Sequence, residues 1–151
     1  MNNHFYIVNI EAAIFKEDRW LMAERSAMEE HAAGTLAMVG GKIEDVEIMN
    51  HVLEETLKRE IEEEVGVTVH DEMQYIKSSA FVTEDGKPVI DIVFLCRHKE
   101  GVPAALDPKE LSAVEWLSYE EIEAHENIQS WTKESLKIAE QMRLSRQENI
   151  T

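Results

Sequence analysis

GGKIEDVEIMNHVLEETLKREIEEEVGV runs from Gly40 to Val67 and carries the clearest structural pattern in this chain. Apolar residues recur every four positions in its second half, at Leu53, Leu57, Ile61 and Val65. This spacing predicts an α-helix with one buried stripe. We place the N-cap of this helix near Asn50 and its end at Gly66, because glycine readily adopts the left-handed conformation that closes a helix.

The same helix would carry several glutamates around Arg59. Glu60, Glu63 and Glu64 stand at positions i, i+3 and i+4, so their carboxylates share one face, whereas Glu62 points towards water. Like charges at this spacing destabilise a helix by a few tenths of a kcal/mol per pair. A hard divalent cation, which prefers oxygen ligands, would offset that repulsion. On the helix alone, a solvated acidic face is the simpler interpretation.

Charge and length limit the classes of protein that this chain can represent. Its 151 residues favour a single domain over residues 1–151. The net charge of −16 argues against binding to a nucleic-acid polymer or an anionic membrane. It would also disfavour a phosphate-containing substrate, unless a metal ion supplies positive charge at the site.

Targeting and redox signals are few. Cys96 is the single cysteine, so neither an intramolecular disulfide nor a cysteine metal cluster is expected. No apolar run approaches the roughly 20 residues of a membrane span, and the first residues lack the apolar core of a signal peptide. We therefore expect a cytoplasmic protein.

Alternating apolar residues predict two strands before the helix. They cover Tyr6 to Ile14 and Trp20 to Glu24, with a turn at residues 16–19. Asn9 and Glu11 fall on the less apolar face of the first strand. They are either solvent-facing or directed into a substrate cleft. A short apolar segment, residues 36–39, then leads into a tight turn at Gly40 and Gly41.

After the helix, the pattern predicts extended chain over residues 67–82, a hairpin turn over 83–88 and a central strand over 89–96. The central strand is almost entirely apolar except for Asp91. Another strand is expected over 110–117, and Ser118 with Glu121 forms a capping box that opens a short helix.

A final helix is expected from about Asn127 to Leu144, followed by a fraying tail over residues 145–151. Its predicted buried side comprises Ile128, Trp131, Ile138, Ala139 and Met142, with Leu136 at the margin.

Residues 40–67 resemble the Nudix box, G-x5-E-x7-R-E-U-x-E-E-x-G-U with U aliphatic, which is the signature of Nudix hydrolases. The second half of the box is matched without a gap by Arg59-Glu60-Ile61, Glu63-Glu64 and Gly66-Val67, and the first half by Gly41 and Glu47. Between Glu47 and Arg59 this chain has eleven residues where the pattern has seven. We place this four-residue insertion within residues 48–51. It leaves the spacing of the later glutamates unchanged and leaves the role of Glu47 open.

The resemblance implies an α/β/α sandwich with a mixed β-sheet and the box helix packed beside it. It also implies hydrolysis of a phosphoanhydride bond in a nucleoside diphosphate linked to another group X. Mg²⁺, or Mn²⁺ in its place, would be held by Glu60, Glu63, Glu64 and the carbonyl of Gly41. One of these carboxylates or Glu110 would take the proton of the attacking water, and Arg59 would orient the glutamates.

Glu110 is chosen because the resemblance extends to a second feature, an acidic loop residue followed by a strand that contains a tryptophan. Here Glu110 precedes Trp116, with Glu100 and Glu115 as alternatives. An acidic loop in so acidic a chain could also match this feature by chance.

The substrate is less well determined. Arg25 or Lys42 would hold phosphate, although Arg25 could equally be a surface residue. Phe81 would stack on a base or belong to the core, and Asn127 would read the base, as in mutator-type nucleotide pyrophosphohydrolases, or cap the last helix. The proline of ADP-ribose hydrolases and the tyrosine of diadenosine polyphosphate hydrolases are both missing from residues 82–84. This favours a nucleoside tri- or diphosphate.

Two other classes remain open at this point. One is a non-catalytic Nudix domain that binds a nucleotide as a sensor, although such domains typically lose box glutamates that this chain keeps. The other is an acidic interaction module without a metal. A homodimer is a further alternative to a monomer, because dimers are common among Nudix proteins.

Overall fold

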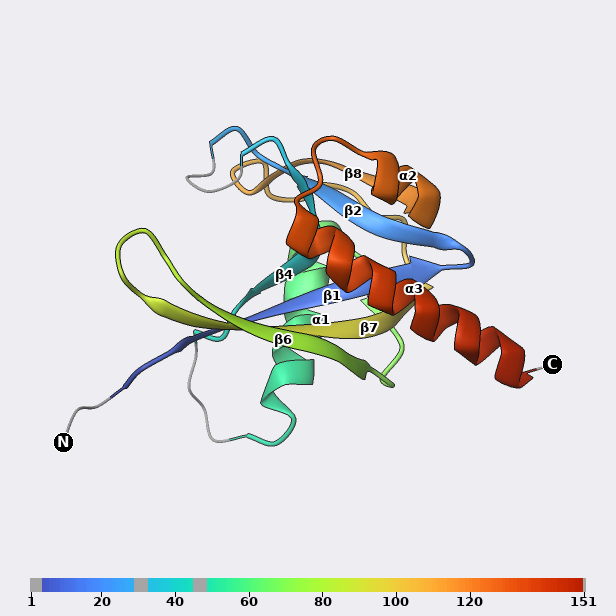
Figure 1. Cartoon of the computed structure of the whole chain (residues 1–151), viewed down its shortest axis with the longest axis horizontal. Helices are drawn as coiled ribbons and strands as arrows, with labels where there is room; N and C mark the ends of the chain where they lie inside the picture. The colour runs from blue at the N-terminus through green and yellow to red at the C-terminus, as the bar shows by residue number, and fades with distance from the viewer. Residues whose placement is uncertain (1–3, 29–32, 45–48, 151) are drawn as a thin grey trace.

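The computed structural model describes residues 4–28, 33–44 and 49–150 (Figure 1). Its strands are β1 (Ile7–Lys16), β2 (Arg19–Arg25), β3 (Leu36–Ala37), β4 (Val39–Lys42), β5 (Thr68–Val69), β6 (Gln74–Val82), β7 (Pro88–Glu100) and β8 (Leu111–Ser118). Its helices are α1 (Val52–Val65), α2 (Tyr119–Ala124) and α3 (Ser130–Ile150). No helix within the described residues is both long and apolar enough to cross a membrane.

The sheet is mixed and centred on β1 and β7, which pair in parallel from Ile7–Val89 to Phe15–Arg97. All other pairs are antiparallel: β2 and β4 lie against β1, β3 and β8 against β2, and β5 and β6 against β7. The predicted hairpin turn connects β6 to β7. β7 extends four residues beyond the predicted end of the central strand.

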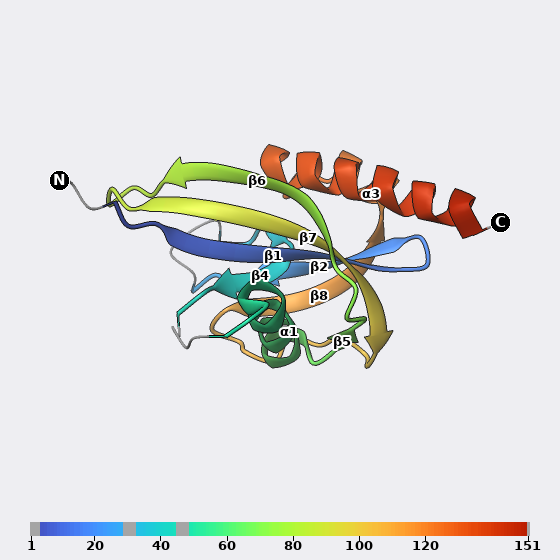
Figure 2. The ribbon, with the colours of Figure 1, turned by 90° about the horizontal axis from the view of Figure 1, so that it is seen from below.

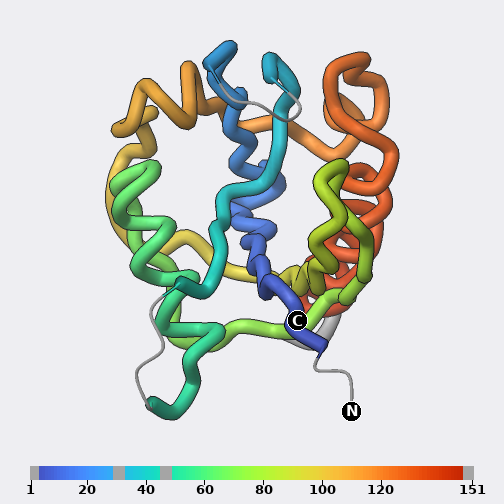
Figure 3. Tube along the Cα trace, turned by 90° about the vertical axis from the view of Figure 1, so that its left-hand side faces the viewer, coloured from blue at the N-terminus to red at the C-terminus, as the bar shows by residue number. Residues whose placement is uncertain are grey.

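Helices cover both faces of the sheet, so the predicted α/β/α sandwich is confirmed. Figure 2 shows β1 and β7 between α1 on one side and α3 on the other, and the end-on view in Figure 3 shows the same three layers. One hydrophobic core lies between the sheet and α1 and includes Ile10, Leu57 and Ile61. The second lies beneath α2 and α3 and includes Trp20 and Leu136.

Helix α1 follows the predicted pattern. Leu57, Ile61 and Val65 are fully buried, and Leu53 packs against the same core. Gly66 closes the helix with a φ of 73°, and its N–H donates to the carbonyl of Glu62 at 3.0 Å. The helix starts one residue later than predicted, since its N-cap is the left-handed His51 and not Asn50. Glu47 and the first residue of the predicted insertion, Ile48, lie outside the described residues.

The predicted tight turn at Gly40 and Gly41 is wrong, because both glycines belong to strand β4. They pair with Glu11 and Ile10 of β1. A Cβ on Gly40 would lie 2.0 Å from the carbonyl oxygen of Ile10, so the close approach of β4 to β1 requires glycine there. The local sequence suggested a turn because it does not reveal this long-range pairing.

Helix α3 differs from its prediction in three respects. It begins at Ser130 and not near Asn127, and it continues to Ile150 where a fraying tail was expected. Arg146, at this end, binds Gln74 at 3.3 Å and Glu72 at 3.7 Å, which ties the end of the helix to β6. Its buried stripe also differs, because Leu136 is fully buried whereas Trp131 is 61% exposed.

Candidate active site

A cavity of about 540 Å³ opens between α1, the N-terminal part of the sheet and the loop before β8. Two other cavities, of about 270 and 320 Å³, are smaller. The polar lining of the main cavity consists of Asn9, Arg25, Lys42, Glu44, Glu60, Glu63, Glu64, Asp107 and Glu110. The candidate site is therefore strongly acidic, with two basic residues at its wall.

Helix α1 places Glu60, Glu63 and Glu64 on the cavity side, as their spacing predicts. Glu62 lies on the other side of the helix, next to a separate cavity. Glu60 packs closely against β4. A Cβ added to Gly41 would lie only 2.7 Å from the carboxyl carbon of Glu60, so no larger residue fits there. The glycine at position 41 therefore lets the helix bring this carboxyl against the strand.

Glu110 joins these three glutamates from the opposite wall. The four residues Glu60, Glu63, Glu64 and Glu110 are called the glutamate face below. The Glu110 backbone is held by two main-chain hydrogen bonds: Ser26 N–H donates to its carbonyl at 2.8 Å, and its own N–H donates to Asp107 at 3.0 Å. Its position is thus fixed by Ser26, the residue after β2, and by Asp107 of its own loop.

Burial raises the pKa of Glu64 to about 9. A hydrogen bond to Glu110 and the negative charges of Glu110 and Glu60 add to this effect, whereas a backbone hydrogen bond from Gly40 opposes it. Burial also raises the pKa of Glu60, with a further contribution from the charge of Glu63. The charge of Arg59 opposes the shift at Glu60. Two carboxyls of the glutamate face therefore hold protons more tightly than exposed glutamates do.

The donor set of this face fits a hard cation, since it offers only carboxylate and carbonyl oxygens. Within the described ranges, no three acidic, histidine or cysteine side chains already converge on one point as ligands. Glu64 and Glu110 instead share a hydrogen bond, which reduces the repulsion between two carboxyls when a proton is present. A bound cation would replace that proton and draw the carboxylates together.

The other predicted catalytic and phosphate-binding residues surround this face. Arg59 is exposed and places its Nε 3.9 Å from Glu63 Oε1, as expected of a residue that orients a glutamate. Arg25 and Lys42 both line the cavity, from β2 and β4. The structure thus brings together the residues that the sequence analysis proposed for metal and phosphate.

The two alternatives to Glu110 lie elsewhere. Glu100 borders the separate cavity on the far side of α1, and Glu115 is exposed in the middle of β8. Glu44 and Asp107, in contrast, line the main cavity although the sequence analysis did not select them. Glu44 follows Gly41 by three residues and Asp107 precedes Glu110 by three residues, and this proximity was the signal in the sequence that could have identified them.

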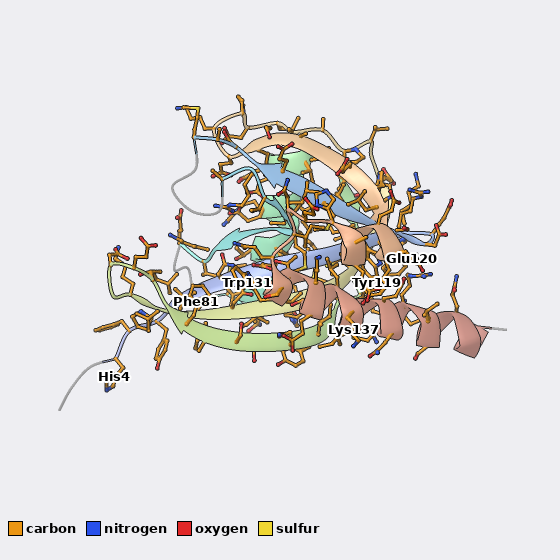
Figure 4. The ribbon with its side chains drawn as sticks, turned by 45° about the horizontal axis from the view of Figure 1, so that its top comes forward. His4, Phe81, Tyr119, Glu120, Trp131 and Lys137 are labelled. Carbon is orange, nitrogen blue, oxygen red and sulfur yellow. The ribbon has the colours of Figure 1, made fainter. Side chains whose placement is uncertain are left out.

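The two residues predicted to contact the base do not line this cavity. Phe81 lies on β6 and is 51% exposed, so it does not belong to the core (Figure 4). Asn127 is also exposed, and its carbonyl accepts a hydrogen bond from the Leu36 N–H at 2.9 Å. Asn127 does not cap α3 either, since that helix begins at Ser130.

A second polar cluster, Asn9, Glu11 and Asp91, lies on the paired strands β1 and β7 and is called the strand network below. Of its members, Asn9 also lines the cavity. Asn9 Nδ2 donates to Asp91 Oδ1 at 2.6 Å. Burial raises the pKa of Glu11 to about 8, with further contributions from the charge of Asp91 and a hydrogen bond to it. The pKa of Asp91 is raised by burial too. Asp91 was visible in the sequence only as the single charge in an apolar strand.

The α/β/α architecture and the glutamate-bearing helix against a glycine-containing strand define a class of nucleotide-processing domains. The family model described as NUDIX domain matches residues 6–137, and the chain belongs to this family. This confirms the resemblance found in residues 40–67. Family membership supports a hydrolase that acts on pyrophosphate bonds of nucleoside diphosphate derivatives.

Solved structures share the fold at low sequence identity. The chain is similar to a MutT NUDIX hydrolase from Burkholderia pseudomallei, with 23% identity and a TM-score of 0.74 over 89% of this chain and 98% of that chain. A MutT protein from Methanosarcina mazei Go1 has the same identity and TM-score over 95% of this chain and 99% of that chain. The NUDIX domain of Shewanella oneidensis NrtR, solved with ADP ribose, is 17% identical with a TM-score of 0.69, over 99% of this chain and 91% of that chain. No curated protein is a significant match.

Proposed function

We propose that this protein is a Mg²⁺-dependent enzyme that hydrolyses a phosphoanhydride bond in a nucleoside tri- or diphosphate. The observation that carries the proposal is the convergence of Glu60, Glu63, Glu64 and Glu110 on one cavity whose wall also holds Arg25 and Lys42. Acidic groups for a cation and basic groups for phosphate are the two requirements for binding a metal–polyphosphate. The NrtR domain that was solved with ADP ribose supports a nucleotide as the class of ligand.

The carboxylates of Glu60, Glu63 and Glu64, with the Gly41 carbonyl, would hold the cation, Mg²⁺ or Mn²⁺. When bound, it would neutralise phosphate charge and lower the pKa of a coordinated water. Burial raises the pKa of Glu64 to about 9, so Glu64 would release a proton when the cation binds. The affinity for the cation should therefore increase with pH.

Glu110 is our choice for the residue that accepts the proton of the attacking water. It lines the cavity beside Glu64, with which it shares a hydrogen bond, and its backbone is held in place by the N–H of Ser26. A general base must lie within hydrogen-bonding reach of the water that it deprotonates. Glu110 would meet this requirement for a water held by a cation at Glu60, Glu63 and Glu64. Arg59 is a positioning residue, since its guanidinium lies beside Glu63.

Arg25 and Lys42 would bind the phosphates, because they are the basic side chains in the cavity wall. Asn9 lines the cavity beside Lys42, so the nucleoside end of the substrate would extend past it. Asn127 and Phe81, both exposed outside the cavity, are proposed as contacts for the base. We further propose a single domain over residues 1–151 that acts in the cytoplasm and has neither a nucleic-acid polymer nor a membrane as its partner.

Release of phosphate or pyrophosphate from a panel of nucleotides with Mg²⁺ tests this function. Wild-type protein should turn over at least one nucleoside tri- or diphosphate. Glu63→Gln should reduce kcat by roughly 10²-fold or more, in line with the loss of one catalytic carboxylate. Glu62→Gln is the matched control, because it makes the same change on the opposite side of α1 and should leave kcat unchanged.

Equal activity of Glu63→Gln and wild type would contradict the catalytic assignment. Nucleotide binding by the wild type without turnover of any compound would instead support the sensor alternative.

A further inference from the structure

Strand β6 forms an open edge of the sheet. Of the described residues, only those of β7 pair with it, and in Figures 1 and 2 no strand lies beyond it. Helix α3 contacts its first half, where Arg146 binds Gln74 and Lys77 lies 3.7 Å from Glu134. The second half, from Ser78 to Val82, is exposed at every position. Its outer main-chain groups are available to another strand.

The register with β7 shows which residues of β6 direct their main-chain N–H and C=O groups towards the free edge. Thr83 N–H donates to Lys87 at 2.9 Å, so this pair is hydrogen-bonded, and Pro88, which has no N–H, stands opposite Val82. Hydrogen-bonded pairs alternate along an antiparallel ladder. Ser79 and Phe81 therefore bond to β7. Their neighbours at positions 78, 80 and 82 direct both N–H and C=O towards the free edge.

Natural proteins usually protect such an edge with charged residues, proline or a bulge. None of these occurs between Ser78 and Val82, although 30% of the whole chain is charged. The other long edge strand, β8, carries Glu115 at its centre and Glu110 immediately before its start. With a net charge of −16, two copies of this chain repel each other least where neither carries a charge. The edge of β6 is such a place.

We propose that two copies of this chain form a dimer by antiparallel pairing of their β6 edges about a two-fold axis at Ala80. In this register Ala80 forms a hydrogen-bonded pair with the partner's Ala80, and Ser78 with the partner's Val82. All hydrogen bonds of this interface come from main-chain groups at positions 78, 80 and 82, which are directed towards the free edge. The same strand can therefore supply both sides of the interface. The β6 strand of the partner thereby supplies the hydrogen-bonding neighbour that the open edge lacks.

Side chains support the same register. Phe81 stands opposite the partner's Ser79, and the two Phe81 rings become diagonal neighbours at about 7–8 Å, within reach of aromatic side chains. Phe81 and Val82 are 51% and 66% exposed in the single chain, so pairing would shield apolar surface. No residue from Ser78 to Val82 lines the cavity of the candidate active site, so the dimer leaves the proposed metal and phosphate contacts unchanged. Phe81, the proposed contact for the base, is the one residue that the two proposals share.

Analytical ultracentrifugation of the full chain tests the dimer. Wild-type protein should sediment at twice 17.4 kDa at micromolar concentration. Ala80→Glu, which places two like charges at the axis, should sediment as a monomer. Ala113→Glu is the matched control, because it makes the same change at an exposed position of the other edge strand, β8, and should remain dimeric. A monomeric wild type, or dimeric Ala80→Glu, would overturn the proposal.

A second variant keeps the proposal testable if Ala80→Glu does not fold. Hydrogen-bonded partners across an antiparallel pair have Cα atoms about 5.5 Å apart, which suits a disulfide. Oxidised Ala80→Cys should therefore become covalently dimeric, whereas Ala113→Cys should not. Cys96 does not interfere because it is fully buried. Failure of Ala80→Cys to cross-link, or equal cross-linking of Ala113→Cys, would contradict the two-fold register.

Discussion

The glutamate face and the strand network are two neighbouring clusters of carboxyls, the first on α1 and the loop before β8, the second on the paired strands β1 and β7. In both, burial is the largest cause of a raised pKa: about 9 for Glu64 in the first and about 8 for Glu11 in the second. They differ in what surrounds them. The glutamate face opens onto a cavity of about 540 Å³, whereas the strand network is completed by an amide donor from Asn9.

This difference indicates two ways to retain acidic groups inside a protein. In the strand network, the carboxyls of Glu11 and Asp91 and the amide of Asn9 form hydrogen bonds with one another when the two carboxyls share a proton. This cluster therefore requires no bound cation. In the glutamate face, four carboxyls meet an open cavity, and Arg59 is the basic side chain that lies beside Glu63. On the function proposed above, a cation would complete the glutamate face but not the strand network.

Enzyme activity should show the largest contrast between the two clusters. Glu64→Gln removes a proposed ligand of the cation and should lower kcat by roughly 10²-fold or more. Glu11→Gln makes the same change in the strand network and should lower kcat by less than about 5-fold, since Glu11 is not part of the cavity lining. Steady-state kinetics on the best nucleotide of the panel checks this. Equal losses in the two variants would mean that the clusters do not differ in function.

Thermal unfolding with and without Mg²⁺ should give the next largest effect. At a concentration one hundred times its Kd, Mg²⁺ should stabilise the wild type by about 2.7 kcal/mol, which raises the Tm by several degrees. Glu64→Gln should lose most of this rise, and Glu11→Gln should keep it. A rise in Tm that is the same for both variants would locate the cation away from the glutamate face.

The strand network should reveal itself in the pH dependence of stability. Glu11 holds its proton up to about pH 8 in the folded state but only to about 4.5 when unfolded. The folded state thus binds more protons in this range, and the free energy of unfolding decreases as pH rises from about 4.5 to 8. Glu11→Gln cannot ionise, so relative to wild type it should gain about 1–3 kcal/mol between pH 5 and pH 9. Denaturant titrations at several pH values measure this, and parallel curves would contradict it.

A surface ion pair provides the baseline for both clusters. Lys58 Nζ lies 2.8 Å from Asp71 Oδ1, and the side chain of Asp71 is 95% exposed. Asp71→Asn should change the free energy of unfolding by less than about 0.5 kcal/mol, because water and salt screen exposed pairs. Denaturant unfolding checks this value. A larger loss would mean that carboxylate burial is not what distinguishes the two clusters from the surface.

Local patterns in the sequence predicted much of the glutamate face. The four-residue spacing of Leu57, Ile61 and Val65 determines which side of α1 is buried, and the cavity side of the glutamates follows from the same periodicity. The end of the helix at Gly66 also depends only on local conformation. Such features could be inferred because the residues involved belong to a single helix.

Features that depend on long-range pairing could not be inferred. Strand β4 looked like a turn until its pairing with β1 was known, and Trp131 looked buried because helical spacing alone does not show which neighbour covers each side. The strand network joins Asn9 to Asp91, which are far apart in sequence but paired across β1 and β7. Asp107 reaches the cavity through a loop that no periodicity describes.

Calorimetric titration of Mg²⁺ tests the central claim most directly, because it requires neither the correct nucleotide nor turnover. The account predicts one saturable site in the wild type, weakened at least about 10-fold in Glu64→Gln and unchanged in Glu62→Gln. Absence of saturable binding to the wild type, or equally tight binding to Glu64→Gln, would contradict the claim that the glutamate face holds the cation.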